Sequence, residues 1–358
     1  MPRIPLEALV AAALPLAVLP LAAQERVASG QTASFTEERV EIYNAIGSVT
    51  LRRATGNAVT VTARAEGDEG SQLVFEADHN AAVGRFRVVF PDVDAIAGLP
   101  GTNSRGSTEL DLRSDGTFGG DNGWRRGRGD RVRIGGGRGF RGYAVVEIGI
   151  PDNRIVKVHL AVGRATADGV TGDILVDTYG ADIEATNIAG DWLFDSGSGD
   201  VVVTGMRGNL RLDTGSGNLA VSRVTGELLD ADTGSGDVDA TDVQVDRFNF
   251  DTGSGNVRAR NLTARRGVVD TGSGDADIVY SGGSVENLTI DTGSGRVYLT
   301  LPPNADALLS IETGGGDATV QRAGAIFERR SDDETVLRFG QGRGRVRIDT
   351  GSGDVVIR

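Results

Sequence analysis

The motif D-T-G-S-G, or a close variant of it, recurs through the C-terminal part of the sequence. It begins at Asp195, Asp213, Asp232, Asp251, Asp270, Asp291, Glu312 and Asp349, and a degenerate copy, DTYGAD, begins at Asp177. Successive copies are 18, 18, 19, 19, 19, 21, 21 and 37 residues apart. Because 37 is close to two periods, we interpret the segment SDDETV near Ser331 as a worn copy in the gap. A unit of 18–21 residues therefore runs from about residue 160 to residue 358.

Each repeat unit alternates apolar and polar residues in two short stretches. Every second residue is apolar in a stretch after the motif, as in Val257 and Ala259. The same holds just before the motif, as in Phe248 and Phe250. Alternation by two predicts a strand with one buried face. One unit cannot bury its apolar face alone, but stacked units can, because each covers its neighbours.

The repeat therefore predicts an all-β fold: a parallel β-solenoid of the β-helix or β-roll kind, with about ten rungs of 18–21 residues and an irregular N-terminal β cap. An antiparallel meander or sandwich is the alternative. That alternative does not need a turn that recurs at one period. It also predicts less agreement between units at outward positions, which here form consistent series such as Asp200, Asn218, Asp237 and Asn256.

The D-T-G-S-G turn itself is predicted to be structural. Asp is expected to accept a backbone N–H two residues on, which closes an Asx-turn. The glycines are expected to supply positive φ angles that other residues resist. The structural glycines predicted in this way are Gly197, Gly199, Gly215, Gly217, Gly234, Gly236, Gly253, Gly255, Gly272, Gly274, Gly293 and Gly295.

Calcium binding is the alternative interpretation of this turn, although the main prediction is that the protein has no cofactor. Oxygen-rich turns attract hard cations, and the predicted ligands are Asp195, Asp213, Asp232, Asp251, Asp270 and Asp291. The motif superficially resembles the G-G-x-G-x-D calcium repeat of RTX β-rolls. That repeat has a much shorter period, however, and Asn218, Asn256 and Arg296 dilute the second acidic series in this sequence.

The sequence divides into three parts by composition. Residues 1–23 combine an early Arg3 with an apolar run and with small residues before Gln24, which predicts a secretory signal peptide. Residues 24–160 are predicted to form the N-terminal β cap region, and residues 161–358 the β-solenoid. The signal predicts export to the periplasm, the cell surface or the extracellular space, and no later segment is long and apolar enough to predict a membrane span.

A Gly- and Arg-rich stretch, residues 92–142, interrupts the cap region and is predicted to be a disordered loop. Its arginines predict a basic arm that binds a polyanion, and the residues proposed for this role are Arg125, Arg126, Arg128, Arg131 and Arg133. The formal net charge of the whole chain is −13, which argues against nucleic acid as a partner.

The sequence offers little support for catalysis. The chain has no Cys, which excludes thiol catalysis and cysteine-based zinc sites. His79 and His159 stand in unrelated contexts, and no known catalytic motif includes them. Polysaccharide-degrading β-helix enzymes use carboxylates together with sugar-stacking aromatic residues. Aromatic residues are only 5% of this chain, and the alternation points residues such as Trp192 and Phe194 inward. We predict no enzyme activity and no catalytic residues.

The stretches NAIGSVTL, GDILVDTYGADIEATNIAGD and the serial DTGSGDV resemble a family of exported β-strand-repeat proteins of unknown function that carry an adhesin label. The resemblance implies a β-solenoid-like domain of a bacterial envelope protein with no known cofactor. We therefore predict an exported structural or adhesin-like module that binds or scaffolds an unidentified envelope glycan or protein. A calcium-stabilised β-roll-like binding protein and a carbohydrate-active β-helix enzyme are the alternatives.

The last residues of the sequence, DVVIR at 354–358, continue a strand pattern with no cap after it. An uncovered terminal rung is a template for another strand. The sequence therefore predicts self-association through the C-terminal rung.

Overall fold

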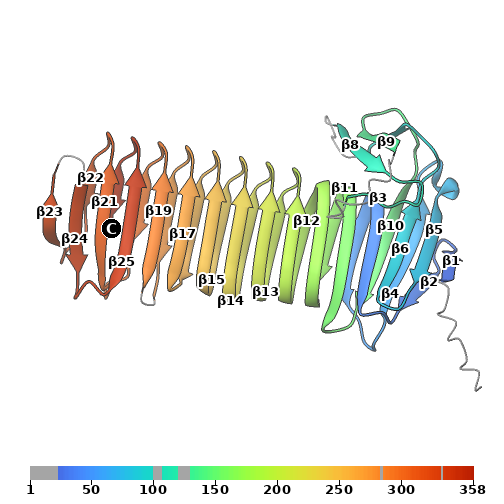
Figure 1. Cartoon of the computed structure of the whole chain (residues 1–358), viewed down its shortest axis with the longest axis horizontal. Coiled ribbons are helices and arrows are strands. Elements are labelled where there is room, and N and C mark those ends of the chain that lie inside the picture. Colours follow the sequence, from blue (N-terminus) through green and yellow to red (C-terminus); the bar gives the residue numbers. More distant parts are fainter. Residues whose placement is uncertain (1–22, 100–106, 120–129, 283–284, 332–333) are drawn as a thin grey trace, which may run out of the picture.

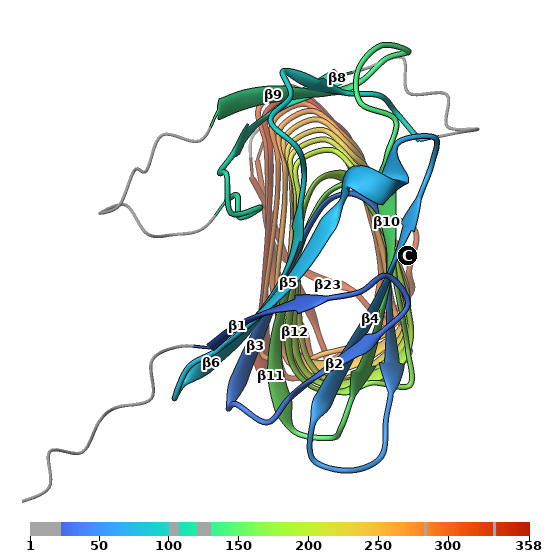
Figure 2. The same cartoon turned by 90° about the vertical axis from the view of Figure 1, so that its right-hand side faces the viewer.

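The computed structural model describes residues 23–99, 107–119, 130–282, 285–331 and 334–358. These residues form a long rod of stacked strands with a small extra sheet near the N-terminal end (Figure 1). Viewed along the rod, the strands trace a flattened coil (Figure 2). The predicted all-β parallel β-solenoid is confirmed. The predicted signal peptide lies outside the described residues except for Ala23.

Each rung of the solenoid places one strand segment on each of two opposed faces. Neighbouring rungs pair in parallel and in register, so that Asp232 lies beside Asp251 and Val238 beside Val257. The strands of the rungs are β3 (Arg39–Arg53), β11 (Arg154–Asp168), β12 (Thr171–Ser196), β13 (Val201–Thr214), β14 (Leu219–Thr233), β15 (Val238–Thr252), β16 (Val257–Thr263), β17 (Arg266–Thr271), β18 (Ala276–Tyr280), β19 (Asn287–Thr292), β20 (Val297–Thr300), β21 (Ala307–Thr313), β22 (Ala318–Val320), β25 (Gly344–Thr350) and β26 (Val355–Ile357).

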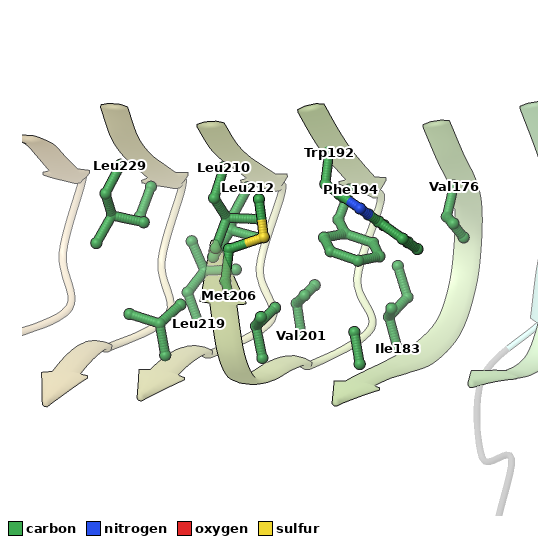
Figure 3. Packing of buried hydrophobic residues seen from close by; sticks show 14 of the residues in the cluster. Val176, Ile183, Trp192, Phe194, Val201, Met206, Leu210, Leu212, Leu219 and Leu229 are labelled. Atoms are coloured by element: carbon green, nitrogen blue, oxygen red, sulfur yellow. The ribbon is translucent and has the colours of Figure 1, made fainter. Parts of the chain in front are cut away.

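Alternate residues of both strand segments fill the interior of the coil. Phe248, Phe250 and Val257 are fully buried, as the alternation predicts. Figure 3 shows the same arrangement around Trp192 and Phe194, whose rings fill the space between opposite segments. Burial of each such side chain stabilises the fold by about 1.5–3 kcal/mol. The interior is therefore one continuous apolar core that runs along the rod.

The N-terminal end of the rod is closed by antiparallel strands, which form the irregular β cap that the sequence predicts. β3 is the first rung, since it pairs in register with β11. Beside it lie β1 (Ala23–Val27), β2 (Thr32–Phe35), β4 (Val59–Glu66), the short 3-10 helix η1 (Gly70–Gln72), β5 (Val74–His79), β6 (Val83–Val89) and β10 (Tyr143–Ile150). β4 pairs antiparallel with β2 and β10, and β5 pairs antiparallel with β1 and β6.

The prediction that residues 92–142 form a disordered loop is wrong for the residues of this range that the structure describes. β7 (Ala95–Ile96), β8 (Ser107–Leu112) and β9 (Asp130–Gly135) form a separate three-stranded sheet, which we call the inserted sheet. One of its faces is buried, through Leu110, Leu112, Val132 and Ile134. Glycine and arginine between and beside these short strands hide their alternation in the sequence. Arg125, Arg126 and Arg128 lie outside the described residues.

The C-terminal strands do not form the last rung of the rod. β25 lies between β19 and β21 (Figure 1) and is parallel to both. β26 lies between β20 and β22. Beyond β21, the strands β24 (Glu334–Phe339) and β23 (Ile326–Arg330) form an antiparallel hairpin. The chain therefore leaves a gap of one rung, turns back through the hairpin and fills the gap.

This topology corrects two expectations. The segment near Ser331 is part of the β23–β24 hairpin and not a worn parallel rung. The strand at residues 355–357 is hydrogen-bonded on both sides, so the reason given for self-association through the C-terminal rung is wrong.

Tyr280 offers a test of core packing. Its side chain is 2% exposed, and its hydroxyl group has no hydrogen-bond partner among the described residues. A buried, unpaired hydroxyl costs free energy that removal recovers. We expect Tyr280→Phe to raise the free energy of unfolding by about 1 kcal/mol in urea denaturation. Tyr298→Phe, at a partly exposed position, serves as the control and should change it little. A loss of stability in Tyr280→Phe would contradict the burial of an unpaired hydroxyl.

Candidate functional site

A column of buried hydroxyl groups holds the D-T-G-S-G turns together. Thr252 Oγ1 donates a hydrogen bond to the carbonyl of Gly236 in the preceding rung, at 2.8 Å, and accepts one from the backbone N–H of Gly255 in its own turn, at 3.0 Å. The same pair of bonds recurs at Thr214, Thr233, Thr271 and Thr350. The motif Thr therefore closes its own turn and joins it to the preceding one. The Asx-turn predicted for the motif Asp is not the source of these bonds.

The twelve predicted turn glycines all lie in the stacked turns, but the reason predicted for them is wrong. None of them lies in the left-handed region of φ. Each is a glycine because the turns stack so closely: a Cβ on Gly255 would lie 1.9 Å from the carbonyl oxygen of Gly236, and one on Gly253 would lie 2.5 Å from that of Gly234. The second glycine of each turn is buried, whereas the first glycine and the Ser between them are exposed.

The outward face of these rungs carries an unbroken line of carboxylates. We call it the acidic column; in spatial order it contains Asp195, Asp213, Asp232, Asp251, Asp270, Asp291, Asp349 and Glu312. Successive rungs of a sheet are about 4.8 Å apart. Partial burial and the neighbouring column carboxylates raise the pKa of Asp232, Asp251 and Asp291. The column is therefore a strip of concentrated negative charge.

The six aspartates predicted as calcium ligands are thus placed side by side along the rod, one for each rung. They do not converge on a point. Among the residues that the structure describes, no group of three or more Asp, Glu or His side chains is arranged to hold a metal ion. Calcium binding remains an untested prediction.

The second polar series, which the sequence interpretation treated as a diluted acidic column, has a structural role. Asp237 Oδ1 accepts hydrogen bonds from the backbone N–H of Asn256, at 2.8 Å, and from its side-chain Nδ2, at 3.1 Å. Asn256 Oδ1 in turn accepts from the backbone N–H of Asp275, at 3.0 Å. Alternation of Asp and Asn places a donor next to each acceptor, so this ladder is satisfied without a cation.

The two series predict opposite responses to pH. A raised carboxyl pKa means that the folded protein binds a proton more tightly than the unfolded chain, so Asp251 destabilises the fold at neutral pH and this cost disappears as pH falls towards about 4. We expect Asp251→Asn to raise Tm at pH 7 and low salt, and to have a smaller effect near pH 4. The measurement is a set of thermal melts at both pH values with and without 0.5 M NaCl.

Asp237→Asn is the matched control for this experiment. Hydrogen bonds from the Asn256 backbone and from Arg258 lower the pKa of Asp237, so its charge stabilises the fold above the usual carboxyl pKa and that contribution is lost as pH falls through the lowered value. Asp237→Asn should therefore lower Tm at pH 7. Equal changes of Tm in both variants, or a change of Tm in Asp251→Asn that is the same at both pH values, would show that the column carboxylates do not repel one another as proposed.

The inserted sheet overhangs the first D-T-G-S-G-like turn of the solenoid and borders an open pocket of about 410 Å³. The pocket is lined by Glu109 and Asp111 of β8 and by Arg113 and Gly119 of the segment after β8. Arg131 of β9 and Tyr179 of the degenerate motif DTYGAD complete the lining residues. Arg131 and Arg133, predicted to belong to a polyanion-binding arm, both pair with Glu109, at 3.6 and 3.9 Å.

Aromatic residues anchor the inserted segment against the solenoid. Phe118 is buried and makes edge contacts with Tyr43, His159 and Tyr179. His159 stacks on Tyr43, with ring centroids 4.5 Å apart, and its Nδ1 lies 2.9 Å from Asp177 Oδ2. The sequence reasoning treated the two histidines as unrelated, and the structure agrees, since His79 pairs with Glu37 elsewhere in the cap. It did not single out Tyr179 or Asp111, although Tyr in place of the first turn glycine was visible in DTYGAD.

The fold and these surfaces define a parallel β-solenoid repeat protein that displays regular polar columns. Residues 133–358 match the family described as Toastrack DUF4097, and the chain belongs to that family. This confirms the predicted β-strand-repeat family of unknown function. Among solved structures, a provisionally assigned cell adhesion protein from Clostridium sporogenes aligns over 94% of this chain and 99% of its own, at 11% identity and a TM-score of 0.19, which supports no conclusion about function.

The search of curated proteins finds no match. Within the described residues, no helix has the length and hydropathy that a bilayer crossing requires.

Proposed function

We propose that the protein is an exported, non-catalytic binding or scaffolding module of the bacterial envelope, in the manner of an adhesin. The observation that carries this proposal is the acidic column together with the exposed glycines and serines of the adjacent turns, which repeat once per rung. A surface with one chemical pattern repeated along a rod suits a ligand with its own linear repeat. Membership of a β-repeat family is consistent with this role.

The chemistry of this surface favours a glycan ligand that is neutral or positively charged. Serine hydroxyls, backbone amides and carboxylates all form hydrogen bonds with sugar hydroxyls. Clustered carboxylates repel polyanions and attract amino groups, and salt weakens both effects. An anionic polysaccharide should therefore bind more weakly than a neutral or amino-bearing one.

A binding screen tests the proposal. The chain from Gln24 onward is tested by pull-down with peptidoglycan sacculi and by calorimetry with soluble peptidoglycan glycan strands, chito-oligosaccharides and alginate. The triple variant Asp213→Asn, Asp232→Asn, Asp251→Asn should lose affinity by tenfold or more, on the order of 1.4 kcal/mol. The control triple variant Asp173→Asn, Glu227→Gln, Asp239→Asn removes as many exposed carboxylates outside the column and should bind as the wild type does. Absence of binding to every probe would refute the proposal.

A calcium-stabilised binding protein is the second candidate function, favoured by the partial burial and the neighbouring carboxylates that raise the pKa of Asp251. A ligand that binds only the folded state raises its stability. Thermal melts with millimolar calcium and with chelator separate the two candidates. A Tm that rises with calcium and returns with chelator supports the second, and an unchanged Tm rejects it.

A further inference from the structure

The pocket beneath the inserted sheet lies at the N-terminal end of the line of turns. Tyr179 occupies the place that an exposed glycine takes in the following turns, Gly197 being the next: a Cβ on Gly197 would lie 2.6 Å from the Tyr179 carbonyl oxygen. The exposed strip of glycine and serine therefore ends at an aromatic ring. A ligand that follows this strip would meet Tyr179 and the inserted sheet.

The inserted sheet turns its polar face to this ring. Glu109, Asp111 and Arg113 alternate along the chain with buried Leu110 and Leu112, so the two kinds of residue point to opposite faces. The burial of Leu110 and Leu112, together with that of Phe118, fixes the sheet against the rest of the protein. The polar groups of the pocket are thus held by packing and not by a free loop.

The charges of the pocket balance. Glu109 and Asp111 face Arg113 and Arg131, which gives two carboxylates against two guanidinium groups. Arg113 donates to Thr117 Oγ1, at 3.1 Å, and to the Gly119 carbonyl, at 3.3 Å, while Arg131 pairs with Glu109. The Asp111 side chain has no partner among the described residues. Such a pocket has no net charge that would favour a cation or an anion, but it places several hydrogen-bond donors and acceptors close together.

Gly119 also lines the pocket. A Cβ there would lie 3.5 Å from Asp177 Oδ2 and 3.8 Å from the Tyr179 hydroxyl, so both groups lie beside the glycine. Asp177 is oriented by its contact with His159. A pocket of about 410 Å³ is within the range that holds a small organic ligand.

We propose that this pocket binds a sugar residue of a neutral glycan, with Asp111 accepting hydrogen bonds from its hydroxyl groups and Tyr179 contacting its ring. The inference rests on the proposed function, because the rest of the glycan would lie along the adjacent strip of turns. Neutral vicinal hydroxyls match the alternating carboxylate and guanidinium groups, whereas a pocket of balanced charge gives a polyanion no net attraction.

The test uses calorimetry of the chain from Gln24 onward with three neutral glycans: N-acetylated chito-oligosaccharides, cello-oligosaccharides and dextran. Asp111→Asn retains the shape of the side chain, and Tyr179→Gly installs the residue that later turns carry. Each should weaken binding by about tenfold, which is the loss of roughly one or two ligand contacts, with Tm unchanged in Asp111→Asn. Asp173→Asn and Tyr298→Thr are matched controls and should retain wild-type affinity.

The outcomes separate the pocket from the wider proposal. If the wild type binds a glycan and both pocket variants bind it equally well, the pocket inference fails while glycan binding by the rod stands. If the wild type binds none of the three probes, both fail. Weakened binding in the pocket variants with unchanged binding in the controls supports the inference. If Tyr179→Gly loses stability, the affinity of Asp111→Asn alone decides whether the pocket binds the glycan.

Discussion

Gly255→Ala is expected to abolish stable folding of the rod or to reduce the free energy of unfolding by more than about 4 kcal/mol. The added methyl group would lie 1.9 Å from the carbonyl oxygen and 2.5 Å from the carbonyl carbon of Gly236. Both atoms belong to the backbone of the preceding turn, so relief requires two rungs to separate and their shared hydrogen bonds to break. Urea denaturation followed by circular dichroism measures the loss.

Gly315→Ala provides the control within the same kind of turn. Gly315 occupies the serine position of its motif, a Cβ there would meet no atom within 4 Å, and its φ is outside the left-handed region. Alanine should be tolerated with a change of at most about 0.5 kcal/mol. Equal losses in both variants would show that backbone freedom, and not close stacking, is the reason for the turn glycines.

Thr252→Val is the second substitution for which we expect a large effect. It retains the shape of the side chain but removes the hydroxyl that bonds to the Gly236 carbonyl and to the Gly255 N–H. Both backbone groups would then be buried without a partner, at a cost of about 1–3 kcal/mol each. The expected loss in the free energy of unfolding is therefore about 2–6 kcal/mol.

Thr252→Ser is the matched variant, because Ser196 already occupies the same column, where its Oγ accepts from the Gly199 N–H at 2.9 Å. The serine hydroxyl should retain both bonds and lose only the burial of one methyl group, about 0.8 kcal/mol. If Thr252→Val were no worse than Thr252→Ser, the hydroxyl column would not be what joins the turns.

The solenoid could be predicted from the sequence because its cause is local and repeated. Residues such as Phe248, Phe250 and Val257 alternate in every unit, and alternation at a constant period has few solutions other than parallel stacking. The roles inside the turn were assigned incorrectly because Asp, Thr and Gly can all shape a turn on their own. Which of them does so here depends on a carbonyl of the preceding rung, a contact that no single unit contains.

The order of the last rungs could not be predicted from the sequence. Residues 344–358 carry the same D-T-G-S-G pattern as the others, so they fit equally well beside β19, where they lie, and beyond β21, where consecutive stacking would place them. Because the rungs have such similar sequences, the sequence of a rung does not indicate its place in the stack. Only the β23–β24 hairpin, which pairs antiparallel with β21, excludes the outer place.

The candidate pocket escaped sequence reasoning for a different reason. Asp111 and Tyr179 are far apart in the sequence and belong to elements with unrelated patterns, and the packing of Leu110, Leu112 and Phe118 brings them together. The substitution of Tyr for glycine in DTYGAD was the one available sign.

Residues 344–358 lie between two rungs that precede them in the sequence, and this position has a consequence for truncated forms of the protein. Residues 344–358 separate β21 and β22 from β19 and β20, and they provide the hydrogen-bonding partners of all four strands. A chain truncated before residue 344 would therefore lose an internal rung and not the last one. The strand edges of β19 and β21 would then lack their partner and could pair with strands of other molecules.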